Sequence, residues 1–354
     1  SVKLIAFAGK EKTYHAWGYA TKAEMEEHGR RYNPCGEYTG DDNEKHYYAD
    51  QTDNYLQKNY QLLFNHTFST AWNLNVALHY TKGDGYYEEY KEDRSFVEYG
   101  LKPFTTDGKE ISESDLVRQK KMDNKFGGGV FSLNYTNHRL TASLGGGINQ
   151  YRGNNFGKVT WVKNYIGALS PDHEYYRNQS KKTDGNIYLK ASYDLTGGLS
   201  AYADLQYRYI SYKIEGDNDK WDWTADPGHL QRLNVNEDFS FFNPKAGLFW
   251  QFNPNHSAYA SFAVAQKEPT RNNYTDGLFD ELPRPEKMLD YELGYTFRNS
   301  RFTAGVNLYY MDYTDQLVLN GKVNDIGEAM AENVKDSYRM GIELSLGARI
   351  TDWL

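Results

Sequence analysis

One polar segment near the start of the chain holds the densest mixture of aromatic rings and cations in any predicted loop. Its members are Tyr14, His15, Trp17, Arg30, Arg31 and Tyr32. Neighbouring arginines can bind carboxylate or phosphate groups through two-pronged hydrogen bonds, and rings supply contact surface for a small molecule. These residues are therefore the first candidate ligand-binding site. The alternative is that the loop packs on its own aromatic side chains and leaves both arginines in solvent.

A second candidate lies in a later polar segment, where Trp221 and Trp223 stand among aspartates 217, 219, 222 and 226. This group could cap a ligand, or its carboxylates could bind Ca²⁺, although the EF-hand spacing is missing. The nine histidines never occur as His-x-x-x-His or His-Glu-x-x-His, and no Gly-x-Ser-x-Gly elbow is found. We therefore expect no catalytic residues, no resident metal and no cofactor.

The elements that must position these residues are long alternating segments. The last of them, residues 338–350, keeps a strict period of two, with Leu344 and Leu346 on one face and Arg339 and Glu343 on the other. At about 3.3 Å per residue this strand is about 40 Å long, against the usual ~17–20 Å of soluble domains. A bilayer core of about 30 Å can be crossed by tilted strands only in a closed barrel. The pattern predicts an all-β fold, an antiparallel transmembrane β-barrel with the leucines toward lipid.

Composition agrees with a barrel. Mean hydropathy is −0.83 and no run of eighteen apolar residues exists, which excludes a transmembrane helix but not strands that are polar on one face. The 32 Tyr and 7 Trp suit two membrane interfaces. A net charge of −8 without basic clusters argues against a nucleic-acid partner. Cys35 is the only cysteine, so no disulfide can form within the chain.

About twelve strands are predicted, and their connections alternate between two to four residues and fifteen or more. The long polar segments begin near residues 11, 91, 151, 213, 266 and 320. Short turns on one rim and long loops on the other are typical of outer-membrane barrels. Residues 22–28 could form a short helix. The glycine triplets 127–129 and 145–147 lie within predicted strands, where they indicate bends or a close approach of another backbone.

Several motifs then resemble one family. Residues 285–295 (PEKMLDYELGY) resemble the "P-E, spacer, Y-E-x-G" signature of TonB-dependent outer-membrane receptors, and residues 337–344 (SYRMGIEL) resemble the "G-x-E" strand that follows it. Residues 242–248, 255–262 and 267–270 are similar to the preceding hairpin and its Glu-Pro edge. Residues 9–17 and 31–34 look like the first long loop of iron-chelate receptors.

The resemblance implies a plugged barrel of about 22 strands in the cell outer membrane, of which residues 1–354 form a partial β-barrel domain. No secretion signal precedes the first strand, so we expect the chain to belong to a longer protein whose plug precedes Ser1 and whose closing strands follow Leu354. The resemblance also implies active import of a scarce small molecule such as a ferric siderophore or other iron chelate. The expected partners are outer-membrane lipid and the TonB complex, which acts through a plug absent from this chain.

Other functions stay open at this point. The same family includes importers of cobalamin, haem and, together with a surface lipoprotein, glycans. A passive porin-type channel would share the strands but have an open lumen and a constriction loop, and an adhesin-like barrel would also fit. The enzymatic alternative is an outer-membrane hydrolase, with Ser and His on the lipid face near the outer rim, and no motif supports it.

Overall fold

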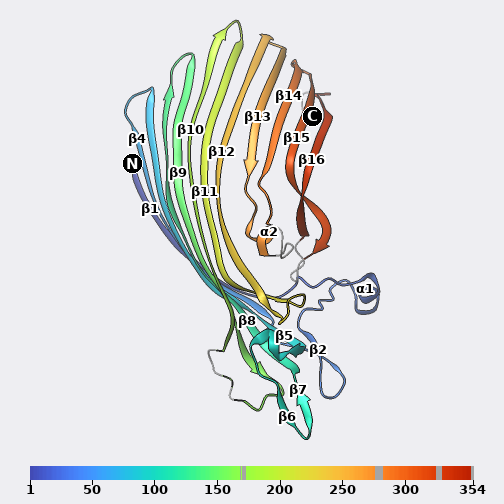
Figure 1. Cartoon of the computed structure of the whole chain (residues 1–354). Coiled ribbons are helices and arrows are strands. Elements are labelled where there is room, and N and C mark those ends of the chain that lie inside the picture. The colour runs from blue at the N-terminus through green and yellow to red at the C-terminus, as the bar shows by residue number, and fades with distance from the viewer. Residues whose placement is uncertain (168, 170–172, 276–281, 324–328, 352–354) are drawn as a thin grey trace.

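The computed structural model describes residues 1–167, 169, 173–275, 282–323 and 329–351. Twelve strands form one antiparallel sheet in which each strand pairs with its sequence neighbours among the long strands (Figure 1). In chain order the strands are β1 (Val2–Tyr14), β4 (Thr52–Thr67), β5 (Trp72–Ser95), β8 (Glu113–Thr136), β9 (Leu140–Val162), β10 (Glu174–Thr196), β11 (Leu199–Asp222), β12 (His229–Asn253), β13 (His256–Lys267), β14 (Glu286–Arg298), β15 (Phe302–Val323) and β16 (Ala329–Ala348).

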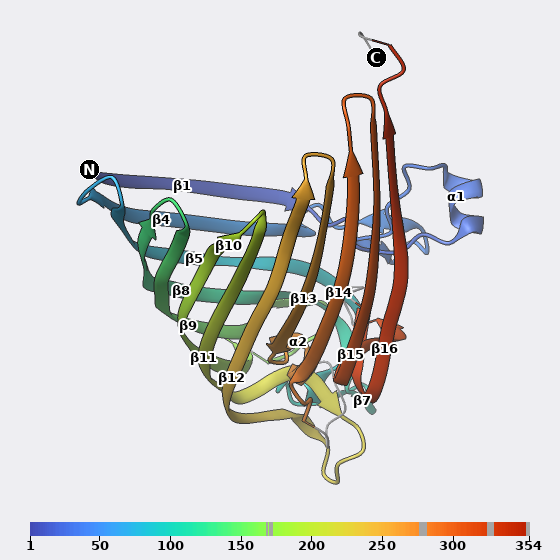
Figure 2. The same cartoon turned by 90° about the horizontal axis from the view of Figure 1, so that it is seen from above.

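The sheet confirms the predicted all-β fold of about twelve strands. Seen from above, it is a curved open wall with a concave interior side (Figure 2). Within the described residues β1 and β16 pair only with β4 and β15, so the wall does not close on itself. No helix in the described part of the chain is long and apolar enough to span a membrane.

The smaller elements all lie in the connections. They are α1 (Lys22–His28), β2 (Glu37–Thr39), β3 (Lys45–Tyr47), the 3-10 helix η1 (Phe96–Tyr99), β6 (Phe104–Thr106), β7 (Lys109–Ile111) and α2 (Arg271–Thr275). Helix α1 has the bounds predicted from the sequence. It begins with a capping box, in which Thr21 and Glu24 bind each other's backbone N–H groups and so satisfy two donors that the first turn leaves free.

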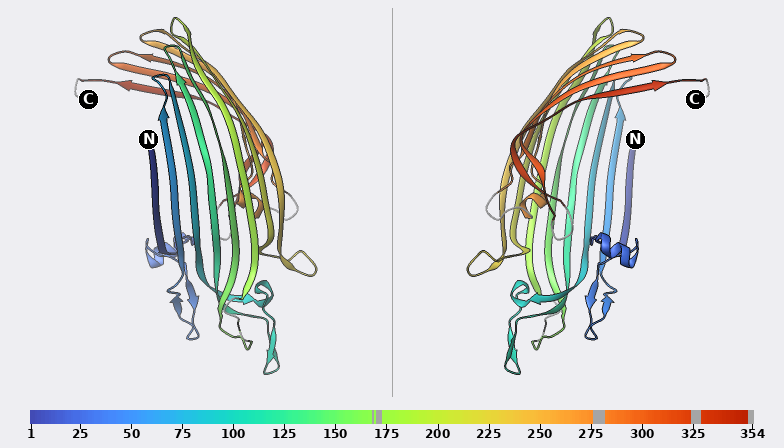
Figure 3. Two further views of the ribbon diagram at one scale, coloured as in Figure 1. Left: turned by 90° about the vertical axis from the view of Figure 1, so that its left-hand side faces the viewer. Right: turned by 90° about the vertical axis from the view of Figure 1, so that its right-hand side faces the viewer.

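Short and long connections lie at opposite ends of the sheet, which we call the turn end and the loop end (Figure 3). At the turn end the strands are joined by residues 68–71, 137–139, 197–198, 254–255 and 299–301. Gly197 and Gly198 have φ values of +55° and +80°, the left-handed backbone that a two-residue hairpin requires. The predicted sorting of connection lengths is therefore confirmed at the turn end.

At the loop end the connections are shorter than predicted because the strands continue into the polar segments. β11 and β12 are joined by residues 223–228 only, and β12 has 25 residues. Beyond the bilayer no lipid covers the outward face, so the ladder continues without regular apolar alternation, and apolar residues such as Ile214 and Val235 face the interior. A segment without this alternation resembles a loop in the sequence.

One face of the sheet carries the predicted apolar band. The cross-strand register places five leucines side by side: Leu74, Leu133, Leu144, Leu189 and Leu205. We call this side the leucine face and the opposite, concave side the interior face. On the leucine face Leu344 and Leu346 are 75% and 86% exposed, which is what acyl chains covering them require. No sealed protein core contains them.

Aromatic rings bound this apolar band. On β5 the band begins at Trp72, which is paired with Tyr135, and ends at Tyr80, which is paired with Tyr60. Tyr80 lies eight residues after Trp72, or about 26 Å along the strand at ~3.3 Å per residue. Barrel strands tilt by about 35–45°, so the band is about 20 Å tall, close to the ~25 Å apolar band of outer-membrane barrels, whose two edges carry aromatic girdles.

The glycine triplets lie within β8 and β9, as predicted. A Cβ on Gly146 would stand 2.4 Å from the backbone oxygen of Asn186, and one on Gly128 would stand 2.3 Å from that of Ile148. Neither distance is possible for a real Cβ, so the approach of the neighbouring strand requires glycine at both positions.

Candidate functional site

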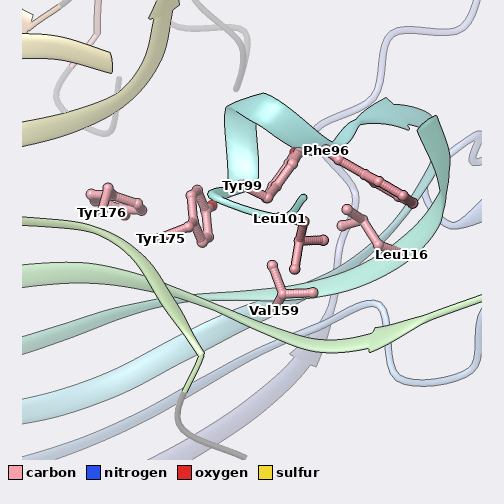
Figure 4. Close-up of a cluster of buried hydrophobic side chains, with 7 residues drawn as sticks. All are labelled: Phe96, Tyr99, Leu101, Leu116, Val159, Tyr175 and Tyr176. Atoms are coloured by element: carbon pink, nitrogen blue, oxygen red, sulfur yellow. The ribbon is translucent and has the colours of Figure 1, made fainter. Parts of the chain in front are cut away.

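The loop end of the interior face is closed over by a buried apolar cluster. η1 folds back onto β8, β9 and β10, and seven side chains pack together there: Phe96, Tyr99, Leu101, Leu116, Val159, Tyr175 and Tyr176 (Figure 4). Phe96, Leu116 and Val159 are fully buried. The rings of Tyr99 and Tyr175 lie with their centroids 4.8 Å apart. This cluster fixes β8, β9 and β10 at the loop end, where charged side chains of the interior face also lie.

The first predicted site lies partly against this wall. His15 stacks on Trp17 with 3.8 Å between ring centroids, and both rings lie nearly perpendicular to Tyr87 on β5, with centroid distances of 5.7 and 5.4 Å. His15 is 1% exposed. Its backbone N–H donates to the carbonyl of Gln51, and its own carbonyl accepts from the amide of Asn33. His15 and Trp17 are thus fixed on the interior face by Tyr87, which the sequence analysis did not single out.

The other members of this site lie elsewhere in the loop. The hydroxyl of Tyr14 shares its one proton between the backbone oxygens of Cys35 and Tyr48, at 3.0 and 3.1 Å. The hydroxyl of Tyr32 donates to the carboxylate of Glu37 at 2.6 Å, next to the ring of His28. These two tyrosines therefore stabilise the loop itself, and their rings also offer contact surface for a ligand.

Arg30 and Arg31 are exposed and form no ion pair with any residue that the structure describes. They follow α1, and Asn33, two residues after Arg31, is the side chain that bonds the carbonyl of His15. Ligand binding by Arg30 and Arg31 stays a prediction.

Burial of His15 has a consequence for pH. Neither ring nitrogen has a hydrogen-bond partner among the described residues, and burial lowers the pKa of His15 below the ordinary 6.5, against a smaller opposing effect of Glu89. Well above pH 6.5 the ring is neutral in the folded and the open loop alike. Below it the open loop takes up the proton first, so this contribution to stability is lost as the pH falls toward the lower folded pKa.

We therefore expect acidification from pH 7 to pH 5 to open the loop in the native protein and not in His15→Phe, which keeps a stacked ring without a titrating group. The buried thiol of Cys35 accepts the Gly18 N–H at 3.1 Å and reports opening through its reactivity. The measurement is the rate of Cys35 labelling by a thiol reagent, read on its peptide by mass spectrometry and expressed as the ratio of native protein to variant at each pH. A ratio that stays constant would contradict the prediction.

The second predicted site is only partly in a loop. Trp221 is the last residue but one of strand β11, and Trp223 lies just after the strand. The Trp223 side chain is 67% exposed, and the two ring centroids are 5.9 Å apart. Asp222 accepts hydrogen bonds from the backbone N–H and hydroxyl of Thr224. Asp219 points to the interior face and is engaged there. Within the described ranges no three His, Cys, Asp or Glu side chains gather as a metal site.

A buried charge cluster on the interior face was missed by the sequence analysis. The guanidinium of Arg118 on β8 donates to Glu89 on β5 at 2.9 Å, to Asp219 on β11 at 3.1 Å and to the hydroxyl of Tyr99 at 3.2 Å. Lys120 pairs with Asp219 at 2.8 Å. Glu89 and Arg118 are 4% and 9% exposed. We call Glu89, Arg118, Lys120 and Asp219 the charge cluster. Three strands and η1 meet at Arg118.

The four groups of the charge cluster hold one another ionised. Burial alone would raise the pKa of Glu89 and Asp219, but the cations beside them outweigh it and both pKa values are lowered. Burial would lower the pKa of Lys120 and of Arg118, and Asp219 above all outweighs it in both, so these pKa values are raised. The cluster therefore presents fixed charge of both signs near neutral pH.

The charge cluster contacts the first predicted site. The ammonium of Lys120 lies 5.4 Å from the centroid of the Tyr87 ring, on which His15 and Trp17 pack. Arg118 and Lys120 are largely buried and already paired with Glu89 and Asp219, so the cluster fixes the position of these rings and does not offer its cations to a ligand. Rings held in this way offer contact surface to a ligand with planar groups.

A second group of charges ties a connecting segment to the inside of the wall. Glu268, just after β13, accepts from Lys182 of β10 at 2.5 Å and from both terminal nitrogens of Arg208 of β11, at 2.9 and 3.1 Å. Arg208 also pairs with Asp184. The Glu268 side chain is 8% exposed. The β13–β14 connection therefore starts by folding inward.

Helix α2 continues this inward segment on the concave side of the sheet (Figure 2). Arg271 donates to the side-chain oxygen of Asn178 at 2.7 Å. Tyr274 packs in a buried cluster with Tyr212, Ile214, Leu233 and Val235 of β11 and β12. Residues 268–275 thus narrow the interior at the loop end.

Comparison with known proteins supports this architecture. The TonB dependent receptor-like, beta-barrel family model matches residues 11–354. A search of curated proteins finds no match.

Among solved structures, the siderophore receptor PiuA from Acinetobacter baumannii is similar with a TM-score of 0.57 and 13% identity over 99% of this chain and 52% of that one. The copper transporter OprC gives 0.61 and 10% over 87% and 47%, and the closed form of the ferric-catecholate import receptor Fiu from E. coli K12 gives 0.54 and 14% over 87% and 47%. At these identities the structures show the fold alone, and this chain spans about half the length of each. Because the family model covers nearly the whole chain, the chain belongs to the TonB-dependent receptor-like β-barrel family of outer-membrane receptors.

Proposed function

We propose that the protein containing this chain binds a scarce ferric chelate at its loop end and imports it across the outer membrane with energy from the TonB complex. The family match over residues 11–354 carries the proposal, and the fold is shared with structures named as ferric-catecholate and siderophore receptors. The rings of Trp17 and Tyr87 and the exposed Arg30 and Arg31, all at the loop end, support an anionic chelate as the ligand, because rings offer contact surface and guanidinium groups bind carboxylate or phenolate oxygens.

We also propose that residues 1–354 form part of a larger barrel. The two outer strands of the described sheet keep unpaired edges, and lipid does not tolerate such edges. The similar structures are about twice as long. Further strands that pair with β1 and β16, and a plug that contacts the TonB complex, would complete the importer.

Uptake of radioactive iron tests the function. Cells that lack the gene, grown with iron withheld, are supplied with a panel of ferric siderophores, and the full-length gene is returned on a plasmid. We expect one chelate class to be accumulated only with the gene and only in cells with an intact TonB complex. Accumulation that needs the gene but not the TonB complex would point instead to a passive channel.

Replacing both Arg30 and Arg31 by Ala is expected to weaken chelate binding about tenfold, because each exposed guanidinium can form charge-assisted hydrogen bonds with the anionic ligand. The measurement is the dissociation constant of the full-length receptor for the chelate found above. Replacing the exposed Lys102 and Lys109 by Ala removes the same charge from the next long connection and serves as the control. Unchanged affinity of the arginine variant would remove those residues from the site.

A further inference from the structure

Six basic residues form one continuous row across six neighbouring strands. They are Lys58 on β4, Lys82 on β5, Lys125 on β8, Arg152 on β9, Lys181 on β10 and Lys213 on β11. Each is the direct cross-strand partner of the next in the antiparallel register. We call this set the basic row. In the sequence these residues are scattered over more than 150 positions, so only the register reveals the row.

The basic row lies on the leucine face. Lys58 stands two residues from Tyr60 and Lys82 two residues from Tyr80, the paired tyrosines that end the apolar band. Because side chains two positions apart on a strand share a face, the row points outward, and on β4 and β5 it lies about 7 Å along the strand beyond the tyrosines, toward the loop end. In an outer-membrane barrel this is the height of the lipid headgroups on the side of the long loops. The row runs at right angles to strands that tilt by about 35–45°, so from Lys58 to Lys213 it rises by about 15 Å away from the turn end.

The charges of the row are unpaired within the wall. All six residues are exposed, and none forms an ion pair in the described part of the chain. Among the described residues, the only side-chain hydrogen bond of the row runs over 2.8 Å from Arg152 to Gln150. Like charges that face each other across strands repel, and here five such pairs follow one another. The arrangement is stable when anions lie between the cations.

Four residues of the row also line a surface cavity. A cavity of about 580 Å³ is lined by Lys125, Arg152, Lys181 and Lys213, with Asp123 and Glu215 on its far side from the membrane. The two acids belong to the next outward row of the leucine face. Positive charge is therefore concentrated from the headgroup level outward, and the sign changes in the next row toward the loop end.

We propose that the basic row is a docking surface for the phosphate groups of phosphorylated lipids in the outer leaflet. Ammonium and guanidinium groups bind phosphate oxygens by charge-assisted hydrogen bonds. With strands about 4.8 Å apart, the row is about 24 Å wide and can take several phosphates side by side. Acyl chains of the same lipids would cover the leucine face directly below. The proposal does not depend on which ligand is imported.

The test measures lipid binding by the full-length receptor in detergent, with native mass spectrometry and purified lipid A as the probe. We expect bound lipid A, at least tenfold weaker binding of the same lipid after enzymatic removal of its phosphates, and no displacement by inorganic phosphate in large excess. The variant carries Lys125→Gln, Arg152→Gln and Lys181→Gln, and we expect it to bind lipid A at least tenfold more weakly.

Two further variants distinguish this surface from general charge. Lys22→Gln, Lys102→Gln and Lys109→Gln together remove as much exposed positive charge from the loop end, and binding should stay at the native level. Lys125→Arg with Lys181→Arg should also retain it, because the charge is kept. Equal binding by the native protein and the glutamine variant of the row would overturn the proposal, as would equal binding of the dephosphorylated lipid. Displacement by inorganic phosphate would overturn the choice of lipid as the occupant. Because no chelate is present, none of these results bears on import.

Discussion

Replacing Arg118 by Ala is expected to destabilise the full-length receptor by about 3–5 kcal/mol, since removal of one partner leaves buried charges uncompensated. Glu89 and Asp219 would both lose the guanidinium that holds them ionised, and Tyr99 would lose its contact between η1 and the wall. The expected result is a lower midpoint of denaturant unfolding in detergent. Local opening would be greatest in η1 and in the outer ends of β5, β8 and β11.

Two controls separate this effect from a general loss of charge. Arg139→Ala removes an exposed arginine at the turn end and should change stability by less than about 0.5 kcal/mol. Adding Glu89→Ala to the Arg118 variant should recover part of the loss, because Asp219 keeps Lys120 and no carboxylate of the cluster then stays buried without a cation. If Arg118→Ala costs no more than Arg139→Ala, the charge cluster is solvated and does not hold the strands together.

The wall could be predicted from the sequence because a strand's alternation is local. Leu344 and Leu346 reveal their face through their immediate neighbours, and the structure places them on the exposed leucine face as predicted. Helix α1 could be predicted for the same reason, since Thr21 and Glu24 of its capping box are three residues apart.

The outer ends of the strands and the charge cluster could not be predicted in this way. Arg118 and Asp219 are 101 residues apart and meet only through η1 and the register of several strands. Where both faces of a strand are polar, the sequence shows no apolar alternation, so the end of β11 up to Trp221 was predicted as a loop. The basic row could not be predicted for the same reason, since Lys82 and Lys125 become neighbours only through strand pairing. Features built by pairing need the register, and the register is set by the apolar band far from them.

The second large effect is expected in residues 268–275, the inward segment of the β13–β14 connection. Glu268→Ala removes three charge-assisted hydrogen bonds from Lys182 and Arg208, whereas Arg208 keeps Asp184. Loss of a buried partner on the order of 3 kcal/mol corresponds to about a hundredfold increase in local opening. We therefore expect amide hydrogen exchange of residues 268–275 in the full-length receptor to rise about a hundredfold.

The matched control is Asp184→Asn, which weakens the same Arg208 network from the wall side without touching the segment. Exchange of residues 268–275 should rise far less in this variant, because Glu268 keeps Lys182 and Arg208. Arg271 and Tyr274 still hold the distal part of the segment through Asn178 and Tyr212, so exchange in Glu268→Ala should be fastest next to Lys267 and slower toward Thr275. Equal exchange in both variants would show that packing of α2, and not Glu268, keeps the segment inside the wall. A segment anchored by one carboxylate can leave the interior as a unit when that anchor is lost, and one held along its whole length cannot.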